Sequence, residues 1–210
     1  MQITGIRSWL VKIPWDHNPG AGSGRDPGQR VFIFVQVETD AGITGWGEVT
    51  TYPGPVANRA VAAYIDQIGH WLRGEDPANI EMIWHKIFRA MTYVGTRGAT
   101  TAAISAIDIA LWDIRGKVLG QPIYQLMGGP VRDRIALYCH PYGTKSPEAI
   151  VESAREIKAS GFKAFKMDPM IHNLHVGNAT YLDGELSAEV EAAALEILAA
   201  ARAEVGPDFE

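Results

Sequence analysis

The sequence predicts an α+β fold in two parts: a three-stranded antiparallel meander with packing helices, then the first two strand–helix (β/α) units of a parallel sheet. Three observations predict it. Apolar residues alternate in strand fashion near the N-terminus, they recur at three- and four-residue spacings through the middle of the chain, and strand-like and helix-like segments alternate toward the C-terminus.

The meander is predicted from three strand-like segments and from the turn between the last two. This turn has the sequence "TDAG", in which Asp40 and Gly42 favour a tight connection. A proline- and glycine-rich stretch, residues 14–29, separates the first two strands. We expect a mobile flap there, because loops of this length in compact domains are usually functional or disordered. The strands are expected at Ile3–Ile13, Arg30–Thr39 and Ile43–Thr51.

Three packing helices are predicted after the meander, from apolar residues spaced three and four apart. The third helix also carries four alanines that allow close approach of a neighbouring element, and Gly120 with Pro122 is expected to end it. The helices are expected at Val56–Leu72, Asn79–Met91 and Ala99–Leu119, and the four alanines are Ala102, Ala103, Ala106 and Ala110.

The last part of the chain predicts two β/α units. The spacing of 29 residues from Ile135 to Ala164 is close to the roughly thirty residues per unit of a barrel with about 250 residues in eight units. Ser146 is the expected N-cap of the first helix, with Pro147 at its first position. The segments are a strand at Ile135–His140, a helix from Ser146 to Gly161, a strand around Lys166 and a helix from Ser187 to Glu204.

Two such units cannot form a complete parallel sheet, because two strands covered on one side leave apolar faces open. We therefore expect a third strand to follow Glu210. On this interpretation the chain is truncated, either as a fragment of a longer protein or as a shortened gene product.

Composition and charge exclude several classes of protein. The formal charge of −5, with 19 Lys and Arg residues that form no basic run, argues against nucleic-acid binding. No segment reads as a membrane-spanning helix or a signal peptide. Cys139 is the single cysteine and lies in an apolar stretch, so we expect a buried, inert thiol and a cytoplasmic protein.

The stretch "GFKAFKMDPM", residues 161–170, places charge in a short apolar strand. In an extended segment Lys166 and Asp168 point to one face, while Phe165 and Met167 point to the other. A buried ammonium or carboxylate needs a partner, a metal or a substrate, since its desolvation otherwise costs several kcal/mol. This pair is therefore a candidate site, and a salt bridge at a barrel rim is its structural alternative.

Three motifs resemble the mandelate racemase and muconate lactonizing enzyme branch of the enolase superfamily. They are "GITGWGE" at 42–48, "AAISAIDIALWDIRGKVLGQPIYQLMGG" at 102–129 and "GFKAFKMDP" at 161–169. The resemblance implies an α+β N-terminal capping domain at residues 1–129 and the start of a modified TIM (β/α) barrel at 130–210. It also implies a homo-oligomer that acts on a small-molecule substrate.

The resemblance further implies a Mg²⁺-dependent enzyme that removes the proton beside a carboxylate and stabilises an enediolate. The family's acidic metal ligands lie at the ends of later barrel strands, beyond Glu210. The family commonly has Lys-x-Lys on the second barrel strand, where this chain has Lys166-Met167-Asp168. Lys166 would then act electrostatically, and Asp168 would bind a hydroxyl or tune Lys166. This departure from Lys-x-Lys favours dehydration of an aldonic acid to a 2-keto-3-deoxy acid.

Other residues are candidates for substrate contact. The first loop contributes His17 and Arg25, the loop after the third strand contributes Tyr52, and the end of the first barrel strand contributes His140 and Tyr142. Their alternative is ordinary solvent exposure. The pair His172 and His175 is weak evidence for a metal, and Asp108 and Asp113 are expected to be structural members of a packing helix.

Two further functions stay open beside the dehydratase. A racemase, epimerase or cycloisomerase could use the same scaffold with a second catalytic group elsewhere. A noncatalytic relative, retained for binding or assembly, would be favoured if the gene ended at Glu210.

Overall fold

The computed structural model describes residues 1–14, 29–49, 55–141, 146–169 and 187–210. Contacts divide the chain into two compact units, with the change from one to the other between Val131 and Arg132. The predicted domain boundary after Gly129 stays a prediction. Within the described ranges, no helix combines the length and apolar character needed to cross a membrane.

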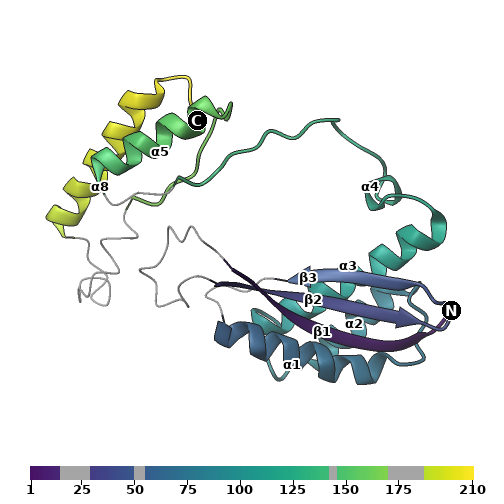
Figure 1. Ribbon diagram of the computed structural model, residues 1–210. Helices are drawn as coiled ribbons and strands as arrows, with labels where there is room; N and C mark the ends of the chain where they lie inside the picture. Colours follow the sequence, from purple (N-terminus) through teal and green to yellow (C-terminus); the bar gives the residue numbers. More distant parts are fainter. Residues whose placement is uncertain (15–28, 50–54, 142–145, 170–186) are drawn as a thin grey trace. The chain divides into compact units, whose positions relative to one another are not determined.

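The first unit contains the predicted meander. An antiparallel sheet has the strand order β1-β2-β3 (Figure 1). Its register pairs Ile6 with Val37 and Val35 with Gly47. The strands are β1 at Ile3–Pro14, β2 at Gln29–Thr39 and β3 at Thr44–Val49. Pro14 and Gln29, the ends of the predicted flap, belong to β1 and β2, while residues 15–28 of the flap and residues 50–51 of the third predicted strand lie outside the described residues.

Helices cover one face of this sheet, as the periodicity predicts (Figure 1). The core forms where Val35 and Val37 of β2 meet Ile107 and Leu111, all of which are buried. Gly120 ends the third helix in a left-handed conformation with φ 61°, as predicted. A short helix that the sequence analysis did not predict follows it. The helices are α1 at Pro55–Leu72, α2 at Ile80–Ala90, α3 at Ala99–Leu119 and α4 at Ile123–Leu126.

The backbones of β3 and α3 approach each other closely. A Cβ atom added to Gly47 would lie 2.0 Å from the carbonyl oxygen of Ala106, and one added to Gly45 would lie 2.1 Å from that of Ala110. Both distances are far below van der Waals contact. The prediction that the alanines of α3 allow close approach is therefore confirmed, and the neighbour is β3.

The second unit contains the two predicted helices, α5 at Pro147–Ala159 and α8 at Ala188–Val205. The Ser146 hydroxyl accepts a hydrogen bond from the N–H of Ala149, so its predicted role as N-cap is confirmed. The helices pack through buried aliphatic residues, and Arg155 donates to both carboxylate oxygens of Glu204 at 3.0 and 3.1 Å. The buried residues of the two helices are Ile150, Ala154, Ile157, Ala194, Ile197, Ala201 and Val205.

The predicted strands of this unit form only one parallel bridge, between Cys139 and Phe165, among the residues that the structure describes. The prediction of a regular strand at Ile135–His140 is wrong before Cys139, because residues 135–138 are exposed and have no ladder. Strands form by pairing with neighbours, and alternation alone does not supply the partner. The barrel stays a proposal.

A third segment joins this pairing at Glu210. The N–H of Glu210 donates to the carbonyl of Lys163 at 3.0 Å, and the N–H of Phe165 donates to the carbonyl of Glu210 at 2.9 Å. Bonds from one residue to the two residues that flank Ala164 are the pattern of a parallel pair. Residues near Cys139, Phe165 and Glu210 therefore lie side by side.

Candidate functional site

The Lys166–Asp168 stretch has two chemically different faces. Phe165 and Met167 pack against the clusters formed by α5 and α8, while Lys166 and Asp168 are exposed. The predicted alternation of side chains is thus confirmed. The catalytic roles assigned to Lys166 and Asp168 stay predictions.

Water can reach both charges. Neither side chain has a hydrogen-bond or ion-pair partner in the part of the chain that the structure describes, so the alternative of a Lys166–Asp168 salt bridge gains no support there. A buried charge needs a partner to offset its desolvation cost. Lys166 and Asp168 are exposed among the described residues, so they do not need such a partner there. Among the described residues, the Lys166 ammonium is thus open to an anion and the Asp168 carboxylate to a hydroxyl donor.

His140 lies on the same face as Lys166. Cys139 packs toward the helices, where burial raises the pKa of its thiol, as expected for an inert cysteine. Its neighbours therefore point the other way, and the rings of Tyr138 and His140 lie 5.8 Å apart. Since Cys139 pairs with Phe165, the next residues, His140 and Lys166, are adjacent across the two segments.

This juxtaposition brings together three of the predicted site residues: His140, Lys166 and Asp168. The sequence analysis did not include Tyr138, although the same two-residue alternation could have found it. The remaining candidates lie outside the described residues, and their roles stay predictions. They are His17, Arg25, Tyr52 and Tyr142, together with the weak pair His172 and His175.

The described residues of this face do not by themselves form a metal site. Among the described residues, no three His, Cys, Asp or Glu side chains lie close enough together to hold a metal ion. The residues present therefore do not fit a Mg²⁺ ion on their own.

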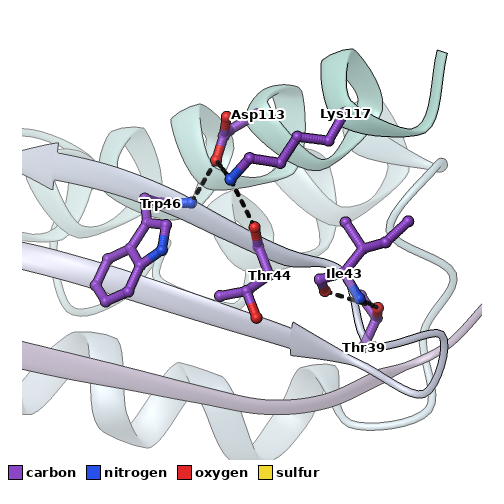
Figure 2. A network of polar contacts seen from close by, with 6 residues as sticks. All are labelled: Thr39, Ile43, Thr44, Trp46, Asp113 and Lys117. Carbon is purple, nitrogen blue, oxygen red and sulfur yellow. Dashed lines mark hydrogen bonds and ion pairs between the residues drawn. The ribbon is translucent and has the colours of Figure 1, made fainter. Parts of the chain in front are cut away.

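Asp113 has the structural role that its place in a packing helix predicts (Figure 2). Its carboxylate accepts the N–H of Trp46 at 2.8 Å and pairs with Lys117 at 2.6 Å. The Lys117 ammonium also donates to the carbonyl of Thr44 at 2.7 Å. Two side chains of α3 thus satisfy backbone groups on the open edge of β3, so the contacts of Asp113 are those of a structural residue.

Asp108 differs from Asp113, although both lie on α3. No hydrogen-bond or ion-pair partner of Asp108 occurs among the residues described, so its expected pairing with an N–H or an arginine is not found there. Partial burial, and to a lesser extent the negative charge of Glu81, raise the pKa of its carboxyl above the ordinary value of 3.8.

Replacing Asp108 with asparagine is therefore expected to stabilise the protein at neutral pH. The raised pKa means that the folded chain holds the proton more tightly than the unfolded chain, so native stability falls as the pH rises through the folded pKa. The gain of Asp108→Asn in urea midpoint should shrink as the pH falls toward 3.8. Asp113→Asn, which breaks the ion pair with Lys117, is the matched control and should lower the midpoint at neutral pH. A loss of stability in both variants at pH 7 would contradict the assignment for Asp108.

Comparison with known proteins identifies the first unit. Residues 7–128 match the family model for the N-terminal domain of mandelate racemase / muconate lactonizing enzyme. A D-galactonate dehydratase of Xanthomonas euvesicatoria pv. vesicatoria (strain 85-10) is 43% identical over 141 residues, which are 65% of this chain and 35% of that relative.

Solved structures match the whole chain. A member of the enolase superfamily from Salmonella Typhimurium has a TM-score of 0.81 at 28% identity, and the match covers 100% of this chain and 53% of that one. The 3,6-anhydro-D-galactonate cycloisomerase from Zobellia galactanivorans has a TM-score of 0.73 at 30% identity, with 100% and 50% covered. The chain thus spans about a third of that curated relative and about half of these structures. By these matches the chain belongs to the mandelate racemase / muconate lactonizing enzyme family of the enolase superfamily.

Proposed function

We propose that this chain supplies the N-terminal part of a sugar-acid dehydratase, a hydro-lyase that converts an aldonate to a 2-keto-3-deoxy acid through an enediolate. The observation that carries the proposal is the 43% identity to a D-galactonate dehydratase, taken with the polar face that holds His140, Lys166 and Asp168. The relative's substrate indicates a class for this protein, not a particular sugar acid.

The proposed reaction begins with loss of the weakly acidic C2 proton. Bound Mg²⁺ would offset the charge that develops on the substrate carboxylate. Because the described residues do not form a set of metal ligands, the ligands are proposed to come from outside them.

The chain's own residues would bind and orient the substrate. The Lys166 ammonium would attract the carboxylate, and Asp168 would accept a hydrogen bond from a substrate hydroxyl. His140, adjacent to Lys166 on the same face, would contact the hydroxyl-bearing carbons. His17, Arg25, Tyr52 and Tyr142 are proposed as further substrate contacts, and His17 and Arg25 would act from a loop that excludes water when it closes.

We propose a (β/α) barrel continuing from the second unit, a boundary between capping domain and barrel near Gly129, and a homo-oligomer in the cytoplasm. The parallel hydrogen bonds at Lys163, Phe165 and Glu210 support the barrel.

The function is tested by incubating the full-length protein with Mg²⁺ and a panel of aldonic acids that differ in stereochemistry at C2 to C5. Appearance of a 2-keto-3-deoxy acid, with loss of the activity on chelation of the metal, is the expected result. Exchange of the C2 proton with solvent deuterium without loss of water would contradict dehydration and indicate racemisation or epimerisation.

Cycloisomerisation is the second candidate function, and the 30% identity to a 3,6-anhydro-D-galactonate cycloisomerase supports it. A product that has the substrate's mass but differs from the substrate and its epimers in bond connectivity, as NMR would show, would identify this reaction.

A further inference from the structure

The segment at Glu210 adds a second carboxylate to the polar face that carries Lys166. The N–H of Glu210 donates to the carbonyl of Lys163 at 3.0 Å, and its carbonyl accepts the N–H of Phe165 at 2.9 Å. These two bonds place Glu210 directly beside Ala164, and directly paired residues of a parallel ladder point to the same face. Since Ala164 lies two residues before Lys166, Glu210 shares the face of Lys166.

The packing of Phe209 supports the same orientation independently of the register. Phe209 is buried in a cluster with residues of α5 and α8, and its ring lies 5.4 Å from that of Phe165. Because side chains alternate along an extended segment, the next residue points away from the helices. Glu210 is accordingly exposed.

The backbone that leads to Glu210 is held in place by α8. The guanidinium of Arg202 donates to the carbonyl of Gly206 at 2.9 Å and also to the carbonyl of Phe209. The bonds to Lys163 and Phe165 fix the next residue along the chain. A carboxylate on a backbone that is already ordered loses less entropy when it binds a ligand than one on a mobile loop does.

A row of three residues crosses the polar face below Lys166. Since Cys139 pairs with Phe165, Tyr138 lies beside Ala164 on one side, and Glu210 lies beside Ala164 on the other. The methyl group of Ala164 thus separates two longer polar side chains. Glu210 is a diagonal neighbour of Lys166, and diagonal neighbours on one face of a sheet are about 7–8 Å apart.

This arrangement can bind the two ends of an aldonate differently. Under the proposed function, the Lys166 ammonium attracts the substrate carboxylate. An ionised carboxylate such as that of Glu210 offers only hydrogen-bond acceptors, so its ligand must be a donor such as a hydroxyl. It also repels the substrate carboxylate, which favours one direction of the substrate chain over the other. The diagonal separation places the bound hydroxyl on a carbon away from the carboxylate.

We propose, on the basis of the proposed dehydration, that Glu210 is a specificity-determining residue of this site. Its carboxylate accepts a hydrogen bond from a substrate hydroxyl on a carbon beyond C3, and it thereby selects the aldonates whose stereochemistry presents that hydroxyl. The hydroxyl takes no part in the reaction at C2 and C3, so the contact serves substrate binding.

Glu210→Gln in the full-length protein tests this role, because glutamine keeps the size of the side chain and removes its charge. The ratio kcat/KM is measured for an aldonate that is turned over and for its analogues deoxygenated at C4, C5 or C6. For the parent aldonate the variant should lose about tenfold or more, chiefly through a higher KM. For the analogue without the contacted hydroxyl, variant and wild type should agree within about twofold.

The matched control is Glu156→Gln, which removes the same charge from an exposed position on α5, on the helix side of the paired segments. It should leave kcat/KM unchanged for every substrate, and circular dichroism should show both variants folded. An equal loss for the parent and all analogues in Glu210→Gln indicates a structural role and overturns the proposal, as does full activity of this variant. A wild type that turns over no aldonate overturns the proposed function as well, whereas the other two results leave dehydration standing.

Discussion

Replacing Lys166 with methionine is expected to lower turnover of a sugar acid by the full-length protein about 100-fold or more. Methionine keeps the apolar stem and removes the ammonium, so on the proposed mechanism the substrate carboxylate would lose a charged partner. If the contact between Lys166 and the substrate carboxylate strengthens as negative charge develops in the transition state, kcat should fall together with kcat/KM. A rise in KM alone would indicate a contact that serves substrate binding only.

Lys163→Met is the matched control for this substitution. Lys163 lies three residues earlier in the same stretch and is exposed, as Lys166 is, but it precedes the bridge between Cys139 and Phe165 and is not adjacent to His140. Its loss should leave turnover unchanged. Equal losses in the two variants would mean that general charge matters, and full activity of Lys166→Met would remove Lys166 from the site.

The local part of this site was predictable from the sequence. A period of two residues is enough to place Lys166 and Asp168 on one face and Phe165 and Met167 on the other, whatever the rest of the fold does. The same period relates Tyr138 to His140. The adjacency of His140 and Lys166, however, depends on the pairing of Cys139 with Phe165, and that register is a long-range property that periodicity does not contain.

The two aspartates of α3 show what could not be predicted from the sequence. Asp108 and Asp113 have the same side chain in the same helix, and their expected roles were identical. Asp113 finds its partner in the N–H of Trp46, 67 residues away, while partial burial without such a partner among the described residues raises the pKa of Asp108. Only the packing of β3 on α3 separates the two outcomes.

Sequence propensity likewise predicts those features correctly that depend only on residues close together in the chain. Ser146 and Gly120 cap their helices as expected, because capping involves neighbours within a few residues. The predicted strand at 135–138 did not form, since a strand needs a partner along its edge. The four-residue helix α4 is too short for a periodic pattern to reveal it.

Replacing Gly47 with alanine is expected to destabilise the first unit by about 3 kcal/mol. The new Cβ would lie 2.0 Å from the carbonyl oxygen of Ala106, and a helix backbone cannot yield locally as a flexible side chain can. Relief requires β3 to move away from α3, which would strain the hydrogen bond that the N–H of Trp46 donates to Asp113 and the one that Lys117 donates to the carbonyl of Thr44. Urea unfolding followed by tryptophan fluorescence measures this unit alone, because all six tryptophans precede Val131.

Gly5→Ala separates this steric effect from the general cost or benefit of removing a glycine. A Cβ at Gly5 meets only Oε2 of Glu38, at 3.2 Å, among the described residues, and that carboxylate is the mobile end of a long side chain. The stability of Gly5→Ala, measured from its urea midpoint, should therefore stay within about 0.5 kcal/mol of the wild type. If Gly47→Ala unfolds at the same urea concentration as Gly5→Ala, β3 and α3 are not in backbone contact. In that case the alanines of α3 would need another explanation.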